Sequence, residues 1–388
     1  MVKHGPDDWT ALWNEISQVF SPGAPIDESD LFAGRVEQLK DLVNAVNQRG
    51  QHAIVFGERG VGKTSLANTF TMFMHRPSLK AVAKRINCDG VASFQSLWRK
   101  VFDEINLDVS VSKDTGPDDI RRSLAAAPAS ARPIIVLDEF DRLAPGKTAG
   151  LIADTIKSLS EHSSNSTIIL VGVADSVSEL LRGHASVGRA LVEIPMPRMS
   201  DDEIMEILDK RAARLGMTMK NVVRKHIVGY SQGLPHYTHL IGLNAFQQAV
   251  SDRKKEVSAS HLKTSIDKCI AKAQQSIKDA YYQATLSQRP DNLFKEVLLA
   301  CSLADTDELG FFAASDVAKP MSRIMESPYA IPSFARHLKE FCTPERGPIL
   351  DRRGETRKFR YRFRDALMRP YVTLRSASSG LLPPDYLA

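Results

Sequence analysis

The sequence predicts an α/β protein: a parallel sheet with helices on both faces, then an all-α lid region and a C-terminal winged-helix domain. Three observations lead to this fold class. Short β-branched apolar runs alternate with helical patterns up to about residue 198, which is typical of a parallel sheet. From Ser200 onward the patterns are helical only. The C-terminal part then combines three helical patterns with an arginine-rich hairpin.

The first expected strand, at 52–56, leads into a glycine-rich segment that fits G-x-x-x-x-G-K-[ST]. Glycines let backbone N–H groups curl around a polyphosphate, and the helix that follows adds its positive N-terminal end. We therefore predict that ATP binds here, with Lys63 on the β- and γ-phosphates and Thr64 on Mg²⁺. The predicted nucleotide-binding residues of this loop are Gly57, Glu58, Arg59, Gly60, Val61, Gly62, Lys63, Thr64 and Ser65.

A second apolar run, at 133–137, ends in Asp138 and Glu139. A carboxylate at the end of a strand beside the loop strand can reach Mg²⁺, directly or through water. We predict this role for Asp138, and we expect Glu139 to take a proton from the attacking water. The alternative is that both carboxylates only begin a loop.

The other elements of the sheet region follow the same alternation. Further strands are expected at 82–88, 167–173 and 191–194. Helices are expected from the segment 31–37 to about 47, and at about 63–74, 93–105, 118–127, 149–160 and 176–181. Residues 8–20 read as an amphipathic helix whose apolar face packs on its own domain, and docking onto a partner is the alternative.

The helical region opens with a capping box, Ser200 with Glu203, before a helix that ends near Leu215. Helices are then expected at 219–231, 235–251 and 258–284, and the segment 287–290 marks a boundary. The predicted domains are an N-terminal helix and linker (1–27), a P-loop core (28–198), a helical lid (199–286), a winged helix (287–376) and a flexible tail (377–388).

The winged helix is expected from helices at 293–303, 312–325 and 331–341 and from a hairpin at 348–363. Residues 346–364 hold eight basic and two acidic residues, so all the excess of the chain's net charge of +5 lies there. We predict that the hairpin contacts nucleic-acid phosphates through Arg352, Arg353, Arg357, Lys358 and Arg360. A solvated strand face or a protein interface is the alternative.

Composition narrows the class of protein. A chain of 388 residues with 43% hydrophobic and 25% charged residues is long enough for two or three domains with real cores. No apolar run is long enough to span a membrane, and the N-terminus lacks an apolar signal core. The four cysteines lack metal-ligand spacing, so we expect reduced thiols in a cytoplasmic protein.

The loop and the carboxylate pair form a Walker A and Walker B combination, and the order of features from 28 to 275 resembles the AAA+ superfamily of ATPases. Among these, STAND-type and origin-initiator-type ATPases are the most similar. The resemblance implies that Phe32 and Gly34, within Leu31–Arg35, border the adenine, and that Pro235, in a Gly-x-Pro element, packs near it.

The resemblance also implies a polar sensor at the end of the strand between the two Walker strands. Asp175 stands there, and it serves either as that sensor or as a plain helix cap. Arg189, with Arg182 as the alternative, would reach into a neighbouring subunit's ATP site. No arginine follows at 236–250, so an arginine sensor in the lid is in doubt, and His236 or no residue takes that role.

The implied function is an ATP- and Mg²⁺-dependent molecular switch. It would bind ATP between the sheet domain and the lid, form a homo-oligomer, and act on DNA or an effector protein through the winged helix. The alternative is a STAND-like signalling or defence scaffold with slow turnover, whose winged helix binds protein only. A small-molecule kinase is disfavoured, because the sequence offers no evident acceptor pocket.

Overall fold

The computed structural model describes residues 8–23, 32–128, 131–143, 147–173, 185–289, 291–355, 358–383 and 386. The chain divides into two compact units. The sheet unit comprises Pro25–Glu58 and Gly62–Pro197, and the helical unit comprises Met1–Ala24, Arg59–Val61 and Arg198–Ala388.

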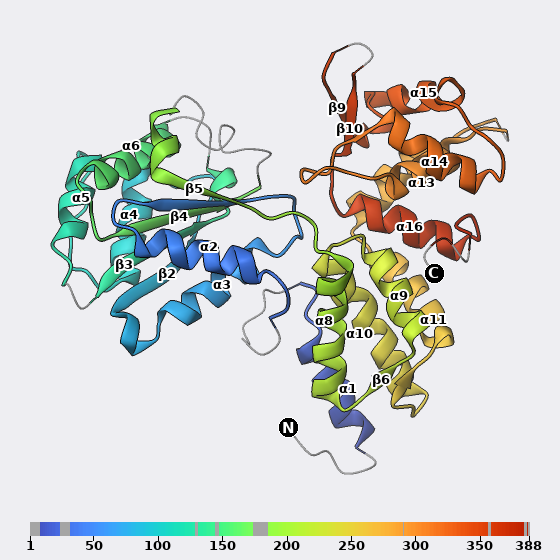
Figure 1. Ribbon diagram of the computed structural model, residues 1–388, viewed down its shortest axis with the longest axis horizontal. Coiled ribbons are helices and arrows are strands. Elements are labelled where there is room, and N and C mark those ends of the chain that lie inside the picture. Colours follow the sequence, from blue (N-terminus) through green and yellow to red (C-terminus); the bar gives the residue numbers. More distant parts are fainter. Residues whose placement is uncertain are drawn as a thin grey trace. The chain divides into compact units, whose positions relative to one another are not determined.

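The sheet unit contains a five-stranded parallel sheet with the strand order β2-β3-β4-β1-β5 (Figure 1). Its strands are β1 (His52–Phe56), β2 (Ala81–Asn87), β3 (Arg132–Asp138), β4 (Thr167–Gly172) and β5 (Leu191–Pro195). The strand β4 pairs with both β1 and β3, so the strand after the carboxylate pair does lie between the two Walker strands, as predicted. The three central strands are buried along almost their whole length, as in other sheets covered on both faces.

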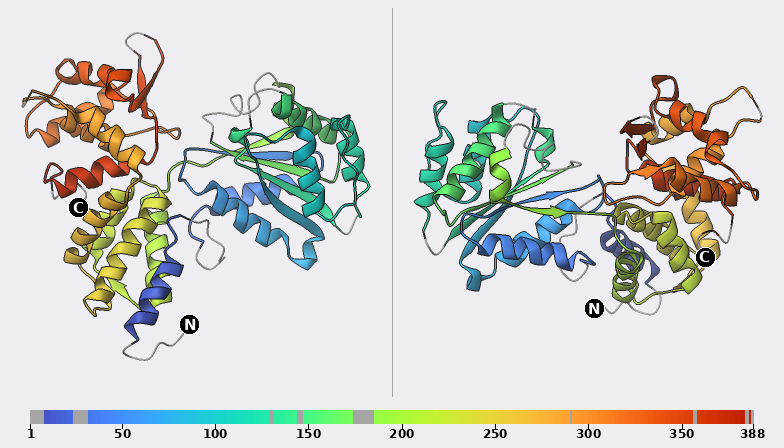
Figure 2. Two further views of the ribbon diagram at one scale, coloured as in Figure 1. Left: turned by 180° about the vertical axis from the view of Figure 1, so that it is seen from behind. Right: turned by 45° about the horizontal axis from the view of Figure 1, so that its top comes forward.

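Helices cover both faces of this sheet, which confirms the predicted fold class. Figures 1 and 2 show α2 and α3 on one face and α4, α5 and α6 on the other. These helices are α2 (Val36–Asn47), α3 (Lys63–Met74), α4 (Phe94–Glu104), α5 (Pro117–Ala125) and α6 (Lys147–Glu161). Short 3₁₀ turns are η2 (Pro77–Leu79), η3 (Phe140–Arg142) and η4 (Ala185–Ala190).

A histidine begins the central strand β1 and is fully buried. The Nδ1 atom of His52 accepts a hydrogen bond from the N–H of Ile168 at 2.9 Å, so the proton of the neutral ring is assigned to Nε2. That nitrogen has no hydrogen-bond partner among the described residues. Burial lowers the pKa of His52 to about 4, because the charged ring would lose its hydration.

Acid should therefore weaken the sheet unit. His52 has a pKa of about 4 when folded and 6.5 when unfolded, so between these values the unfolded chain binds the extra proton. Stability is complete above pH 6.5 and falls as the pH drops toward 4, by up to about 1.4 kcal/mol per pH unit. His52→Asn keeps an acceptor for Ile168 and should flatten this slope in denaturant unfolding at pH 4.5–7. The same change at the exposed His162 should leave the slope unchanged, and equal slopes in all three proteins would contradict the prediction.

The helical unit holds the remaining elements. Its lid region contains α8 (Asp201–Leu215), α9 (Asn221–Ser231), α10 (Pro235–Ser251), α11 (Ala259–Lys272) and α12 (Gln275–Thr285), with a two-stranded sheet of β6 (Thr218–Met219) and β7 (Glu256–Val257). The single helix predicted at 258–284 is wrong. It ends at Lys272, and Ala273 and Gln274 take extended ψ angles of 150° and 140° before α12 begins.

The N-terminal helix α1 (Trp9–Val19) packs against α8 and α10, within the same unit. Phe20 is fully buried against Gly242 of α10, where an added Cβ would lie 2.4 Å from the phenylalanine ring. Arg211 of α8, also fully buried, donates from Nε to the carbonyl oxygen of Val19 at 3.1 Å. The N–H of Ser21 donates to Nδ1 of His239 at 3.1 Å. The apolar face of α1 thus packs on its own chain, as predicted.

The C-terminal elements follow the order α13, β8, α14, α15, β9, β10, α16. They are α13 (Phe294–Leu303), β8 (Phe312–Ala313), α14 (Ala314–Ile324), α15 (Ile331–Glu340), η5 (Pro344–Arg346), β9 (Leu350–Arg353), β10 (Arg360–Phe363) and α16 (Met368–Ser378). The three strands form an antiparallel sheet in the order β8-β10-β9. The predicted second helix is therefore two residues too long at its start, because Phe312 and Ala313 pair with β10.

The helix α16 was not expected, and it continues to Ser378, beyond the predicted start of a flexible tail. Pro370 lies in its first turn, where the missing N–H costs no helical hydrogen bond. The helix is buried along most of its length and packs on α13 and α11. Tertiary packing therefore stabilises a segment whose proline and serines favour a turn.

The structure also bears on the cysteines and on the apolar segments of the sequence. All four cysteines are free thiols, and Cys88, Cys269 and Cys301 are buried. Among the described residues, no helix has the length and apolar character that crossing a bilayer requires.

Candidate nucleotide-binding site

The glycine-rich loop connects the end of β1 at Phe56 to the start of α3 at Lys63. Gly60 and Gly62 have φ angles of +86° and +95°, in the left-handed region that favours glycine. Gly57 lies against the chain after β5, where an added Cβ would be 2.4 Å from the carbonyl oxygen of Met196. Three of the predicted glycines are thus needed for the path of the backbone itself.

Lys63 is the first residue of α3, and only 8% of its surface is exposed. Its Nζ donates to the carbonyl oxygens of Gly57 at 3.0 Å and Glu58 at 2.7 Å. The ammonium group therefore sits within the curl, at the N-terminus of a helix of 12 residues. A cation and a helix N-terminus in one place favour an anion such as a phosphate. Thr64 and Ser65 follow in the first turn of α3, both half-buried.

Asp138 is the last residue of β3 and is 2% exposed. Its Oδ1 accepts the N–H of Glu139 at 2.8 Å. Glu139 takes a left-handed conformation, φ 54°, as the chain turns into η3. Its carboxylate forms an ion pair with Arg142, whose Nη1 lies 2.7 Å from Oε2. Because β1 and β3 are parallel strands of one sheet, the loop and both carboxylates lie at the same sheet edge.

Sequence analysis missed two residues at this edge. Arg85 of β2 donates from Nη1 to Oδ2 of Asp138 at 2.9 Å and to Oδ1 of Asn87 at 2.8 Å. Alternation along β2 puts Arg85 and Asn87 on one face of the strand, which is a signal the sequence does contain. Their contact with Asp138 follows from the pairing of β2 with β3, which the sequence pattern leaves open.

Other predicted residues of the sheet unit lie apart from the loop in sequence. Phe32 is half-buried and Gly34 is buried with φ +64°, directly before Arg35, whose Nη2 donates to the carbonyl oxygen of Pro197 at 2.5 Å. Arg189 is exposed in η4, immediately before β5, as predicted. Asp175 and the alternative Arg182 lie outside the described residues.

Pro235 is the first residue of α10 in the helical unit. It follows Gly233, whose φ is +72° and whose added Cβ would lie 2.7 Å from the carbonyl oxygen of Met199. The Nδ1 of His236 lies 2.7 Å from the carbonyl oxygen of Pro22, and burial lowers the pKa of this histidine. Gly233 and Pro235 thus set the path of the backbone as it enters α10. A role in nucleotide binding for Pro235 and His236 stays a prediction.

The arginines of the hairpin do not all share one face. Arg353 is paired in register with Arg360, and the guanidinium groups of Arg353 and Arg362 lie 5.1 and 4.6 Å from the ring centre of Phe311. Arg352 is in register with Tyr361 and lies 4.3 Å from the ring of Phe359 instead. Arg352 therefore lies on the opposite face of the hairpin from Arg353, Arg360 and Arg362.

Two further hairpin residues complete this surface. Arg360 forms an ion pair with Asp307 at 3.1 Å, so part of its charge is balanced. Lys358 is exposed, and Arg357 lies outside the described residues. The hairpin therefore presents arginines that aromatic rings hold in place, which lowers the entropy cost of contacting a partner.

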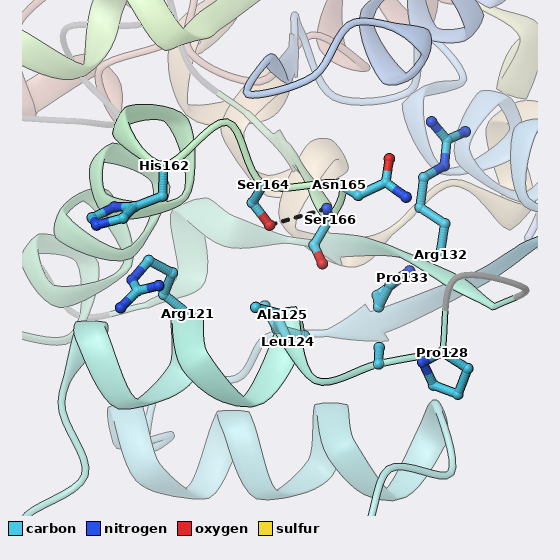
Figure 3. Close-up of a pocket in the computed structure, with 11 residues that line it drawn as sticks. Arg121, Leu124, Ala125, Pro128, Arg132, Pro133, His162, Ser164, Asn165 and Ser166 are labelled. Atoms are coloured by element: carbon cyan, nitrogen blue, oxygen red, sulfur yellow. Dashed lines mark hydrogen bonds between the residues drawn. The ribbon is translucent and has the colours of Figure 1, made fainter.

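Figure 3 shows a small pocket of about 170 Å³. It lies where β3 and β4 begin, at the end of the sheet opposite to the glycine-rich loop. Its lining comes from α5, the start of β3 and the segment between α6 and β4. Arg121 of this lining is already paired with Asp118 at 2.8 Å. The pocket is therefore separate from the candidate nucleotide-binding site.

Comparison with known proteins identifies the class. Residues 46–181 match a family described as AAA domain, and this range contains the loop, Asp138 and Glu139. The matched range of the chain is therefore similar to an AAA domain. Together with the five-stranded sheet and the helical region after it, this match supports the predicted resemblance to AAA+ P-loop ATPases.

Solved structures share the fold over nearly the whole chain. A structure of Cdc6p from Pyrobaculum aerophilum is 17% identical, with a TM-score of 0.51, over 94% of this chain and 97% of that one. Orc2 of Aeropyrum pernix, described with ADPNP and ADP, is 14% identical, with a TM-score of 0.52, over 94% and 98%. Orc1 of Aeropyrum pernix in complex with DNA is 16% identical, with a TM-score of 0.51, over 94% and 97%. No curated protein matches the sequence significantly.

Proposed function

We propose that this protein is a Mg²⁺-dependent ATPase switch that assembles into homo-oligomers and acts on DNA through its C-terminal hairpin. The observation that carries the ATPase is the buried ammonium of Lys63 inside the glycine loop, with Asp138 and Glu139 at the same sheet edge. The AAA domain match supports it. Lys63 binds phosphate, and Glu139 orients and deprotonates water.

The residues present fit a magnesium ion. Mg²⁺ prefers oxygen ligands and keeps several waters, and the Thr64 hydroxyl and the Asp138 carboxylate supply such oxygens. Among the described residues, no group of three or more His, Cys, Asp or Glu side chains could hold a metal ion alone. We therefore infer that the ion is held by Thr64, Asp138 and the nucleotide's own phosphates. Bound there, it would neutralise charge on the transferring phosphoryl group.

Replacing Glu139 should separate binding from hydrolysis. Glu139→Gln keeps the size of the side chain but removes the base, so ATP should still bind while phosphate release falls by about 100-fold or more. Phosphate release and retention of labelled ATP measure the two effects. Glu161→Gln, at the exposed end of α6, is the matched control and should behave like the wild type. Unchanged turnover in Glu139→Gln would remove this residue from the mechanism.

We infer that Arg189 completes the ATP site of a neighbouring subunit. Its exposure immediately before β5 supports this role, because a neighbour can reach it. An arginine supplied from outside makes hydrolysis depend on assembly.

Mixing two inactive variants tests this assembly. Lys63→Ala and Arg189→Ala should each lack ATPase activity alone. In an equal mixture about one interface in four joins an intact Lys63 to an intact Arg189, so about a quarter of the activity should return. Phosphate release of the mixture measures it, with separate incubations as the control. A mixture as inactive as its parts would mean that Arg189 does not act across an interface.

We propose that the C-terminal elements form a winged helix that contacts DNA phosphates. The element order α13-β8-α14-α15-β9-β10 and the sheet order β8-β10-β9 support the winged helix. The arginines held over Phe311 and Phe359 support phosphate contact, since they are exposed or half-exposed and pre-organised. Contacts of this kind fix position and carry little sequence preference.

The salt dependence of the affinity for DNA should reveal the contribution of the hairpin. Changing Arg352, Arg353 and Lys358 to Ala should weaken binding to duplex DNA about tenfold or more. It should also lower the slope of log affinity against log salt by about 2–3. Fluorescence anisotropy at several salt concentrations measures both. Changing Lys254, Lys255 and Lys263, exposed elsewhere in the helical unit, removes equal charge and should have little effect.

A scaffold with slow turnover is the second candidate, and one observation favours it. Arg142 holds the carboxylate of Glu139 in an ion pair, so this carboxylate is not free to turn toward an attacking water unless the pair opens. In this case the hairpin would contact an effector protein. The absence of measurable DNA or RNA binding by the intact protein at low salt would favour the scaffold.

A further inference from the structure

The Walker B carboxylate has a cation of its own in the sheet unit. Asp138 has a side chain that is 3% exposed, and Arg85, whose side chain is 26% exposed, contacts it at 2.9 Å. The other oxygen of Asp138 accepts the N–H of Glu139. Both carboxylate oxygens are thus engaged by groups of this chain. A carboxylate buried to this degree is costly unless a cation or hydrogen bonds compensate it, and Arg85 supplies the cation.

The position of Arg85 follows from strand pairing. Asn87 is in register with Asp138, and Arg85 is in register with Val136, so all four residues lie on one face of the sheet. The Nη1 of Arg85 bridges Asn87 and Asp138, at 2.8 and 2.9 Å. The guanidinium is therefore fixed at two points rather than swinging freely at the edge strand.

We propose that Arg85 is the resident counter-cation of Asp138 and competes with Mg²⁺ for this carboxylate. The proposal rests on the ATPase function proposed above. A guanidinium that neutralises Asp138 lowers the negative potential that attracts a dication, and its positive charge repels an ion that binds nearby. Arg85 is thus a positioning residue that raises the Mg²⁺ concentration needed for ATP binding. In the absence of the ion it keeps the buried carboxylate compensated.

The neighbouring residue offers a matched control. Lys84 lies on the opposite face of β2 and forms a more exposed ion pair with Glu104 of α4, at 3.9 Å. Removing its charge changes the same edge strand without touching Asp138. An effect of net charge or of strand stability should therefore appear when the charge of either Lys84 or Arg85 is removed. A change in the Mg²⁺ concentration needed for binding should appear only at Arg85.

A magnesium titration tests the competition. Arg85→Gln keeps a hydrogen-bond donor but removes the charge. With a fluorescent ATP analogue at fixed concentration, we expect the half-saturating Mg²⁺ concentration to fall about tenfold relative to the wild type. Lys84→Gln should match the wild type. A half-saturating concentration that stays equal or rises in Arg85→Gln would overturn the proposal.

A second measurement needs neither nucleotide nor metal. Without them, Arg85→Gln leaves Asp138 buried with no cation, so the thermal midpoint should fall by about 5 °C. Adding Asp138→Asn to Arg85→Gln should recover most of that loss. Additive midpoints in this double-mutant cycle would overturn the counter-cation role even if ATP binds normally. A wild-type protein that binds no analogue at any Mg²⁺ concentration would refute the ATPase function and the competition together.

Discussion

The constraint on which the sheet unit depends is the burial of a lysine ammonium inside a backbone loop. A buried cation needs partners, and the curl of the loop supplies carbonyl oxygens to Lys63 on one side. That curl is possible only where glycines take left-handed φ angles, as Gly60 and Gly62 do. It also needs the buried strand β1 behind it and the close approach of Met196 to Gly57. The conformation of the loop, the strand before it and the chain beside Gly57 thus all contribute to the burial of a single charge.

Much of this could be predicted from the sequence, for a physical reason. The loop is local: its glycines meet the needs of the backbone, and its lysine and threonine stand at fixed positions relative to them. The alternation of strands and helices is also local, so the strands of the sheet unit and its described helices are confirmed, while the helix expected at 176–181 lies outside the described residues. The place of β4 between β1 and β3 was implied by the family resemblance, and it is confirmed as well. The partners of Asp138 and Glu139 were not predicted. Arg85 reaches Asp138 only because β2 pairs with β3, and strand neighbours are a tertiary property.

The wrong predictions for the helical unit have the same cause, since they also concern features that tertiary packing determines. The break between α11 and α12 carries neither glycine nor proline, so a continuous helix was a reasonable but wrong expectation. Packing on α13 and α11 determines α16 despite its proline. In the hairpin, Tyr361 and Phe363 alternate with arginines, and both are buried, so alternation does indicate which face of β10 packs. It could not show that arginines on both faces lie over the rings of Phe311 and Phe359, since Phe311 comes from a segment some fifty residues earlier.

The docking of α1 also has a consequence for biosynthesis. Ser21 and its partner His239 are separated by 218 positions, and Phe20 is buried only against α10 and its neighbours. At roughly 5–20 residues per second, a ribosome needs on the order of 10–45 seconds to make the intervening chain. Until α8 and α10 have been made, Leu12, Ile16 and Val19 lack the native surface that covers them. The apolar stripe of α1 is thus made early and buried late, and it stays uncovered while the whole sheet unit is synthesised.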